Sequence, residues 1–315
     1  MKAARDEKGF ALIIALIVTT LLVALLVEFV DEVFVDASHS HNFVDSQQAS
    51  LLADSGIEAG IKLLQASALL RGGKAYSSLT EPWAKPQMKE TDAGTLTLTI
   101  EEESGKLDLG SATSQTGTPN KFFQDVALRL LTKLQLSPDL YDSLSDWVDT
   151  DDTPRAGGAE TSYYMGLKPP YRAHNNRLDT VEELALVKGF TPEVMAKLKP
   201  LVTVYGSGPD FGAAPTARIN INTAAPELLA SLDDQLTRGD LVERILEYRK
   251  SKPITNLADI PGIGTLAQAL QLYVCYQGTV YRIHAEGRVG ESVSVAEAVV
   301  TNIDSTPKIL YWREY

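Results

Sequence analysis

An uncharged, apolar run near the amino terminus constrains the fold of this 315-residue chain more than any other stretch. The run extends from Gly9 to Val27, and the short segment before it is basic at Lys2, Arg5 and Lys8. About 20 apolar residues let a helix cross a bilayer, and flanking positive charges favour the cytoplasmic side. The run does not end in the small residues of a secretory cleavage site. The sequence therefore predicts one retained membrane span, with the bulk of the chain exported.

The dipeptide Gly9-Phe10 lies before the apolar run, on its charged side. This placement resembles the leader of type IV pilins and type II secretion pseudopilins, in which a prepilin peptidase cuts after the Gly and the new N-terminal Phe is methylated. The resemblance implies a cleaved cytoplasmic leader of residues 1–9 and a mature chain that begins at Phe10, with its span in residues 10–27. A plain signal anchor is the alternative interpretation.

After Val27 the pattern becomes amphipathic, with apolar residues from Val30 to Leu64 spaced mostly by threes and fours. No proline interrupts the chain from Phe10 to Arg71, and Gly72-Gly73 follows. This pattern predicts one long helix, whose first half lies in the membrane and whose second half packs on a domain.

Two regions far apart in the chain show the alternation of half-buried strands. The first is 95–101, for which a turn at 104–106 and a partner strand at 107–109 are expected; residues 74–89, with two prolines, indicate a loop. The second region contains 280–289 and 292–300, with an edge strand expected at 308–313. Because two-stranded ribbons are marginally stable, we expect both regions to form one sheet against the long helix, an α+β fold.

The region between the strands has a helical pattern. A linker composition at 111–120 precedes helical periodicity up to Val148, and a short strand at 218–222 precedes a helix capped by Thr223. Residues 177–202 and 254–274 each indicate a short helix, a glycine turn and a second helix, a helix-hairpin-helix-like (SAM-like) repeat. We therefore predict a pilin-like fold in two parts, 28–111 and 273–315, interrupted by a large all-α insertion at 112–272.

Motifs along nearly the whole chain resemble the K class of type II secretion minor pseudopilins. They are the Gly9-Phe10 leader, residues 103–107, the stretch from Asp146-Trp147-Val148-Asp149 to Asn176, Glu183-Leu184, and Asn220-Ile221-Asn222-Thr223-Ala224. The resemblance implies a single-pass inner-membrane protein with its bulk in the periplasm. It also implies a structural role at the tip of the pseudopilus, with partners of the I and J classes above a major pseudopilin.

One departure from the general pilin pattern supports this class. Most pilins carry a Glu five residues into the mature chain, which can neutralise the N-terminal amine of a neighbouring subunit. Here that position is Ile14. A missing charge suits a subunit at the end of a stack, and the K class is similar in lacking it.

Carboxylates crowd into a Gly- and Pro-containing stretch that follows the predicted helix. The candidate ligands are Asp146, Asp149, Asp151, Asp152 and Glu160, with Asn176 or Asn175 to complete the shell. Oxygen ligands without His or Cys favour Ca²⁺ over Zn²⁺, although the spacing is not that of an EF-hand. This loop is similar to one in the K class, whose members bind calcium in the inserted domain. The resemblance therefore implies a structural Ca²⁺. A solvated acidic loop balanced by Arg155 and Arg172 is the alternative.

There are three alternatives to this function. A type IV minor pilin shares the same anchor and leader. A helix-hairpin-helix DNA-binding membrane protein would need local positive charge, whereas the net charge is −12. An enzyme is not indicated, because residues 206–212 miss the spacing of phosphate and dinucleotide loops. The lone Cys275 is expected to pack in a core.

Overall fold

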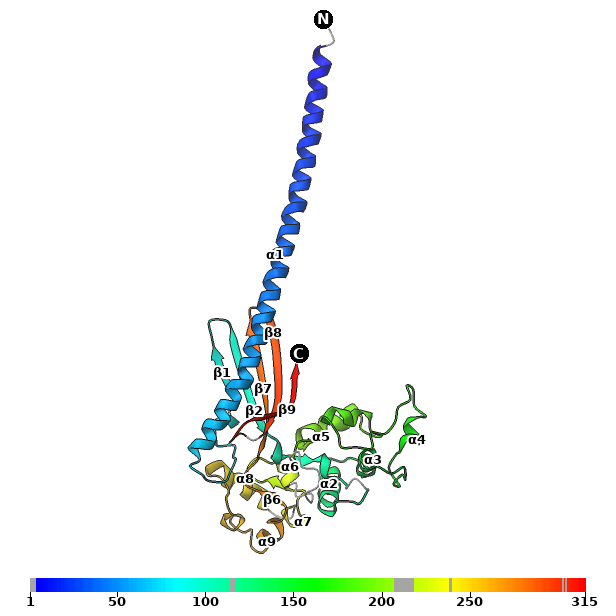
Figure 1. Cartoon of the computed structure of the whole chain (residues 1–315), viewed down its shortest axis with the longest axis vertical. Coiled ribbons are helices and arrows are strands. Elements are labelled where there is room, and N and C mark those ends of the chain that lie inside the picture. Colours follow the sequence, from blue (N-terminus) through cyan, green and yellow to red (C-terminus); the bar gives the residue numbers. More distant parts are fainter. Residues whose placement is uncertain (1–3, 114–116, 207–217, 238–239, 302, 304) are drawn as a thin grey trace.

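A single long helix projects far beyond the rest of the molecule (Figure 1). The computed structural model describes residues 4–113, 117–206, 218–237, 240–301, 303 and 305–315. Helix α1 spans Ala4–Leu70 and begins earlier than predicted. The residues after it, Gly72 and Gly73, have positive φ angles of 60° and 82°. Glycine adopts this conformation without steric cost, so the predicted end of the helix is confirmed.

Only the last third of α1 packs on the folded part of the chain. Ala49, Ala53 and Ile57 are buried, whereas Val30 and Phe34 are exposed. The expectation that the amphipathic pattern packs from Val30 onward is therefore wrong for residues 28–44, whereas Asp45 already lies beside Gly290, in the turn between two strands of the sheet. In the described chain one helix, in the stretch Gly9–Leu70, is long and apolar enough to cross a membrane.

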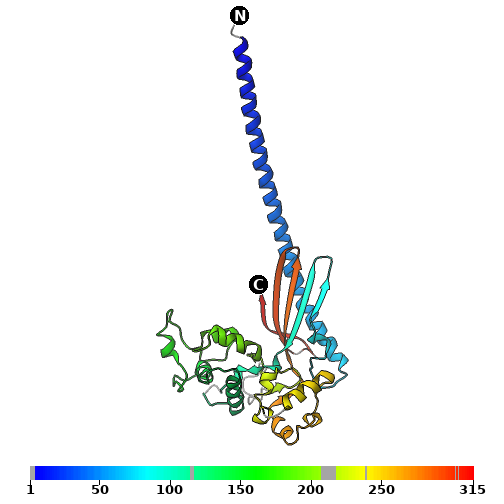
Figure 2. The ribbon, with the colours of Figure 1, turned by 180° about the vertical axis from the view of Figure 1, so that it is seen from behind.

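Five antiparallel strands form one sheet against α1, in the order β1-β2-β7-β8-β9 (Figure 2). The strands are β1 Gln87–Glu90, β2 Thr95–Glu102, β7 Val280–Val289, β8 Ser292–Thr301 and β9 Lys308–Glu314. Strands β2 and β7, nearly 200 residues apart in sequence, pair with Ile100 opposite Ile283. The predicted single sheet and its edge strand β9 are confirmed.

Helix and sheet approach one another closely because small residues face each other. A Cβ atom added to Gly287 of β7 would lie 2.3 Å from the Ala49 carbonyl oxygen of α1. A Cβ atom on Gly60 would lie 2.7 Å from Cγ2 of Ile283. Larger residues at these two glycines would force α1 away from the sheet.

Two local predictions about the sheet are wrong. Residues 74–89 are not all loop, because β1 begins at Gln87 and forms a hairpin with β2, with Lys89 opposite Leu96. The short strand β3 (Leu107–Asp108) does not pair with β2. A 3-10 turn, η2 (Glu103–Gly105), leads the chain out of the sheet, and β3 pairs in parallel with β4 (Val202–Thr203).

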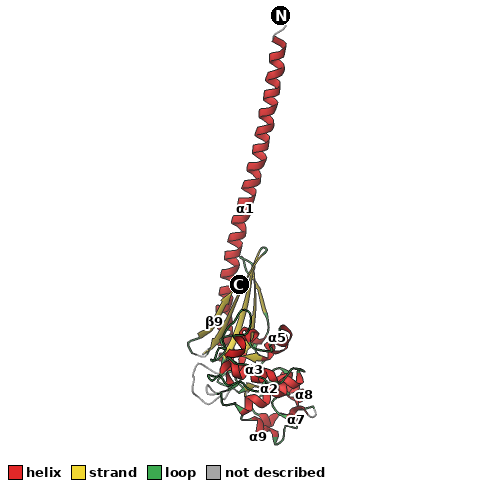
Figure 3. Ribbon diagram, turned by 90° about the vertical axis from the view of Figure 1, so that its right-hand side faces the viewer, coloured by secondary structure: helices red, strands yellow, loops and turns green. Residues whose placement is uncertain are grey.

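Between β2 and β7 the chain forms a second, mostly helical body (Figure 3). Its helices are α2 Lys121–Lys133, α3 Asp139–Val148, α4 Thr161–Tyr164, α5 Pro192–Leu198, α6 Pro226–Leu229, α7 Asp234–Thr237, α8 Leu241–Ser251 and α9 Leu266–Leu270. Its 3-10 helices are η3 Leu109–Ser111, η4 Val181–Leu186, η5 Lys199–Leu201 and η6 Leu257–Asp259, while η1 Pro82–Ala84 lies beside α1.

The expectation of an all-α insertion is wrong in detail. The helical body contains the parallel pair β3–β4 and a second parallel pair, β5 (Ile219–Asn220) with β6 (Val274–Cys275). Thr223 does not cap α6, because Ala225 occupies the position before that helix. The Thr223 hydroxyl instead donates to Glu102. The Cys275 thiol is half-buried and free in β6, and burial raises its pKa to about 12.

The two predicted hairpins correspond to η4–α5 and η6–α9. In each, the first helix is a 3-10 segment, and a glycine with positive φ follows, Gly189 at 87° and Gly262 at 82°. Glycine permits these tight turns because it lacks a side chain.

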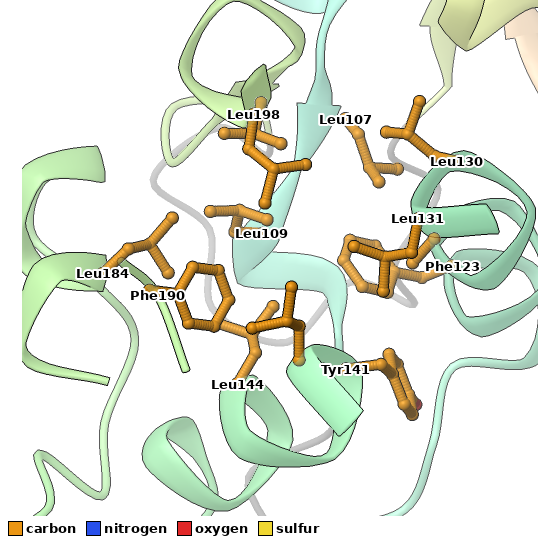
Figure 4. A pocket seen from close by; sticks show the side chains of 13 residues that line it. Leu107, Leu109, Phe123, Leu130, Leu131, Tyr141, Leu144, Leu184, Phe190 and Leu198 are labelled. Atoms are coloured by element: carbon orange, nitrogen blue, oxygen red, sulfur yellow. The ribbon is translucent and has the colours of Figure 1, made fainter. Parts of the chain in front are cut away.

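Two separate hydrophobic cores lie under these elements. One packs α1 on the sheet with Ala53, Ile57 and Trp83 among its members, and the other runs through the helical body from Leu107 to Val274. The second core encloses a small cavity of about 30 Å³ (Figure 4). Because its lining is apolar and it is no larger than roughly one water molecule, it is a packing gap. The domain boundaries at 111/112 and 272/273 stay predictions.

Two adjacent buried glutamates join the sheet to the helical body at the end of β2. Glu103 is fully buried and accepts from Arg282 Nε of β7 at 2.8 Å, from Lys106 Nζ at 3.2 Å and from the Thr203 hydroxyl of β4. Burial acts to raise the pKa of Glu103, but the two cations outweigh it and hold that pKa below its ordinary value.

The neighbouring Glu102 faces the helical body. It accepts from the Ser104 backbone N–H at 2.8 Å, from Asn220 Nδ2 at 3.1 Å and from the Thr223 hydroxyl. Burial raises the pKa of Glu102, because its partners are uncharged groups. The joint between the two bodies therefore contains one carboxylate held charged by cations and one whose charge is disfavoured.

Candidate metal centre

The acidic loop, defined here as residues 149–160, begins where α3 ends. Asp149 follows the last residue of α3, and its backbone N–H donates to the Ser145 carbonyl at 3.1 Å. The Thr153 backbone N–H donates to Asp151 Oδ1 at 2.8 Å, which turns the loop back. Glu160 then precedes α4 without capping it through its side chain. Short backbone turns at both ends thus bring three carboxylates of the loop together.

Arg155 fills one side of this loop. Its Nη1 atom donates to Asp146 Oδ1 at 2.5 Å and to Asp149 Oδ2 at 2.7 Å, and Nη2 donates to the Gly117 carbonyl at 2.8 Å. Asp146 also accepts from the Arg155 backbone N–H at 3.0 Å. Asp146 is fully buried, so the guanidinium supplies the compensation that a buried carboxylate requires.

A second group of carboxylates in the loop consists of Asp149, Asp151 and Glu160. One carboxylate oxygen from each lies within 4.8 Å of the others. Among the described residues, no hydrogen bond reaches Asp149 Oδ1 or either side-chain oxygen of Glu160, although Glu160 is only 2% exposed. A buried carboxylate without a partner is costly, which leaves these oxygens available to a cation.

The pKa shifts in the loop follow from this arrangement. Burial, followed by the negative charges of Asp146 and Asp149, raises the pKa of Glu160 to about 8. Burial also raises the pKa of Asp149, against the opposing effect of the Arg155 hydrogen bond. The carboxylates therefore repel one another, and the Arg155 guanidinium offsets only part of this repulsion.

A lysine distant in sequence holds the loop in place. Lys188 Nζ donates to the Gly157 and Gly158 carbonyls at 3.1 and 2.9 Å, and the Gly157 N–H donates to Asp142 Oδ2 at 3.0 Å. Gly158 itself must lack a side chain, because a Cβ atom there would lie 1.9 Å from Asp146 Oδ2. The sequence predicts that Lys188 lies in the glycine turn of the hairpin at 177–202, and nothing in its local pattern indicates this contact.

The remaining predicted ligands differ in exposure and in their partners. Asp152 is exposed, although its charge contributes to the raised pKa of Glu160. Asn176 is exposed, and its Oδ1 accepts from the Arg177 backbone N–H. Asn175, in contrast, donates its backbone N–H to the Trp147 carbonyl at 2.9 Å, and its buried Oδ1 has no partner among the described residues. Arg172 is exposed.

The oxygen group fits a hard divalent cation. Ca–O distances are about 2.3–2.6 Å, so three carboxylate oxygens that lie within 4.8 Å of one another can bind the same ion. Three carboxylates leave further positions for water or backbone oxygens, as Ca²⁺ requires six to eight ligands.

The predicted leader and assembly residues lie at the opposite end of the molecule. Gly9, Phe10 and Ile14 are helical residues of α1 and are exposed in the isolated chain. They lie on the part of α1 that projects beyond the sheet.

A long N-terminal helix on an antiparallel sheet, interrupted by a helical body, defines a pilin-like, single-pass membrane-anchored subunit. Residues 105–207 and 219–273 match two family models described as type II secretion system (T2SS), protein K, which together cover about half of the chain. The chain belongs to this protein K family. Its members are minor pseudopilins, structural components of a protein secretion system. The alternative of a minor pilin from a type IV pilus is therefore excluded.

Curated relatives and a solved structure agree. The chain is 24% identical over 245 residues to type II secretion system protein K of Pectobacterium carotovorum subsp. carotovorum, covering 73% of this chain and 72% of the relative. It is 27% identical to the Klebsiella pneumoniae protein K, covering 72% and 69%. A chain of the GspK-GspI-GspJ complex from the enterotoxigenic Escherichia coli type 2 secretion system shares the fold. For this pair the TM-score is 0.67, the identity is 18%, and 88% of this chain and 99% of the other are covered.

Proposed function

We propose that this minor pseudopilin is the subunit at the tip of a periplasmic pseudopilus, anchored in the inner membrane through residues 10–27. The observation that carries the proposal is the position of the helical body, at the end of the molecule farthest from the amino terminus (Figure 1). A further subunit stacked beyond it would have to occupy the space that this body fills. The shared fold with a chain of the GspK-GspI-GspJ complex supports partners of the I and J classes.

The amino terminus supports the same role. We infer that prepilin peptidase cuts after Gly9 and that Phe10 is methylated. Ile14 offers no carboxylate to the N-terminal amine of a neighbour, which suits a subunit with a neighbour on one side only, above the major pseudopilin.

The assembly is tested with the full chain, co-expressed with I- and J-class partners and the peptidase and extracted in detergent. We expect a 1:1:1 complex in native mass spectrometry, in which this chain begins at methylated Phe10. The control Gly9→Val should retain residues 1–9, because the peptidase requires the Gly. Recovery of the chain alone, or in many copies along each filament, would contradict the tip position.

We propose that the hairpins η4–α5 and η6–α9 serve as helix-hairpin-helix-like packing units in a structural, non-catalytic subunit. Their first helices bury Leu184 and Leu257 in the core of the helical body. The chain carries a net charge of −12, which opposes contact with phosphates. A gel-shift titration with duplex DNA at low salt should show no complex.

We further propose that Asp149, Asp151 and Glu160 hold one Ca²⁺ ion with a structural role. The support is the buried, unpartnered Glu160 carboxylate beside two other carboxylates. A bound ion would neutralise their repulsion and hold the acidic loop to the end of α3. Since an ion that binds only the folded state stabilises it, calcium should raise the thermal stability of the helical body.

Thermal unfolding of the full chain in detergent tests the site. Calcium at about 100 times its Kd should stabilise the fold by about 2.7 kcal/mol, a rise in melting temperature of roughly 5–10 °C relative to chelator. Glu160→Gln should abolish most of this rise, whereas the matched control Asp92→Asn, at an exposed turn, should retain it. Equal melting temperatures in calcium and in chelator for the unsubstituted chain would refute the site.

A further inference from the structure

The contacts of Arg155 are those that a metal ion would make. Its guanidinium touches one oxygen of Asp146, one oxygen of Asp149 and the Gly117 carbonyl. Two carboxylate oxygens and a backbone carbonyl are a ligand set typical of Ca²⁺. The Arg155 side chain therefore lies where the surrounding oxygens would otherwise need a cation.

Asp149 links this position to the candidate metal site. Its Oδ2 atom accepts from Arg155, while its Oδ1 atom is buried without a hydrogen bond from any described residue. Asp151 and Glu160 each place a carboxylate oxygen within 4.8 Å of an oxygen of Asp149. The acidic loop thus has two adjoining cation positions that share Asp149, and the protein's own side chain fills one of them.

The charges of the loop support two cation positions, of which Arg155 occupies one. Within residues 146–160 Arg155 is the one positively charged side chain, and its ion pairs are to Asp146 and Asp149. The Lys188 ammonium is directed to the Gly157 and Gly158 carbonyls instead of to a carboxylate. One divalent ion beside Arg155 would therefore offset the repulsion that remains among Asp149, Asp151 and Glu160, whereas a second ion would have to displace the guanidinium.

We propose that Arg155 is a built-in substitute for a second metal ion and limits the acidic loop to one divalent cation. The statement about the remaining ion rests on the proposed calcium site. Substitution of Arg155 by an uncharged residue should then open the second position, formed by Asp146, Asp149 and the Gly117 carbonyl. The backbone N–H of residue 155, which bonds Asp146 Oδ2, would be unaffected.

The number of ions per chain, counted by native mass spectrometry of the full chain with calcium, tests the proposal. We expect one ion in the unsubstituted chain and two in Arg155→Gln. Arg155→Lys should bind one ion, because the positive charge is kept. The double variant Arg155→Gln/Asp146→Asn should also bind one, because the second position loses its buried carboxylate.

Thermal unfolding gives an independent readout. Arg155→Gln should melt well below the unsubstituted chain in chelator, and calcium should remove at least half of that difference, because the ion takes over the role of the guanidinium. An ordinary ion pair predicts a different result, namely one ion and the same deficit in calcium and in chelator, which would overturn the proposal. An Arg155→Gln chain that stays unfolded in calcium while the double variant folds would overturn it as well.

The outcomes separate this proposal from the calcium site itself. If the unsubstituted chain binds no ion and Arg155→Gln binds one, Arg155 replaces a cation and the site of Asp149, Asp151 and Glu160 is refuted. If both chains bind one ion, the site stands and the role of Arg155 is refuted. If neither binds, both are refuted.

Discussion

Replacing Glu103 by Gln is expected to destabilise the protein by about 3–5 kcal/mol, the cost of removing one partner from a buried ion pair. The fully buried carboxylate lies between Arg282 and Lys106. An amide would remove the carboxylate that both cations share, would leave Arg282 with Glu297 and Lys106 with the exposed Glu101, and would present a donor to one of them. The melting temperature of the full chain in detergent should fall by roughly 10 °C.

The adjacent Glu102 provides a matched control. Its partners are the Ser104 N–H, the Asn220 amide and the Thr223 hydroxyl, so Glu102→Gln removes no charge pair. We expect a loss of about 1 kcal/mol, the usual net value of one hydrogen bond. Equal losses for the two variants would show that the cations around Glu103 do not hold the joint.

The pH dependence of the two variants should be opposite in sign. The pKa of Glu103 is held low in the folded state, so its stabilising effect is complete above the unfolded pKa, near 4.5, and fades as pH falls below it. The pKa of Glu102 is raised, so its contribution is complete at acidic pH and fades as pH rises above about 4.5. The cost of Glu103→Gln should therefore shrink toward pH 3, and the cost of Glu102→Gln should shrink toward pH 8.

Trp147→Ala is expected to cost about 3–5 kcal/mol, as for other buried tryptophans. Trp147 is 2% exposed, packs edge-on against Tyr164 with ring centroids 4.9 Å apart, and donates to Glu183 Oε1 at 2.7 Å. It lies on α3 between Asp146 and Asp149, so its loss should also weaken the calcium response. Differential scanning calorimetry with calcium and with chelator measures both effects.

Trp83→Ala is the matched control in the other core. Trp83 is equally buried and packs edge-on against Tyr281, with centroids 5.4 Å apart. Because the two tryptophans belong to separate cores, Trp83→Ala should lower stability by a similar amount and leave the calcium-dependent rise intact. Loss of that rise in Trp83→Ala would show that the calcium site depends on packing in the sheet core, and would contradict the separation of the two bodies.

Local periodicity was sufficient to predict α1 and the central strands. The strict alternation of β2 and β7 fixes which faces are buried, and the glycines after Leu70 end the helix. The partner of β3 could not be predicted in this way, since a two-residue strand carries no periodicity and its pairing with Val202–Thr203 depends on the packing of the whole helical body.

The candidate metal site shows the same limit. The concentration of carboxylates around Asp149 is visible in the sequence, but their division into two groups depends on the direction taken by Arg155. The stabilising contact of Lys188 comes from a residue about 30 positions away. Such contacts arise from tertiary packing, for which spacing along the chain carries no information.

The exposed part of α1, residues 28–44, fixes the height and the orientation of the folded part relative to the apolar span. These roughly 17 residues correspond to about 25 Å of helix, and each residue turns the chain by about 100° about the helix axis. Removal of one residue would rotate the sheet and the helical body by that angle. Removal of seven would lower them by about 10 Å and restore their orientation to within about 20°. The length of this segment, counted in single residues, therefore decides which side of the folded part faces neighbours anchored in the same membrane.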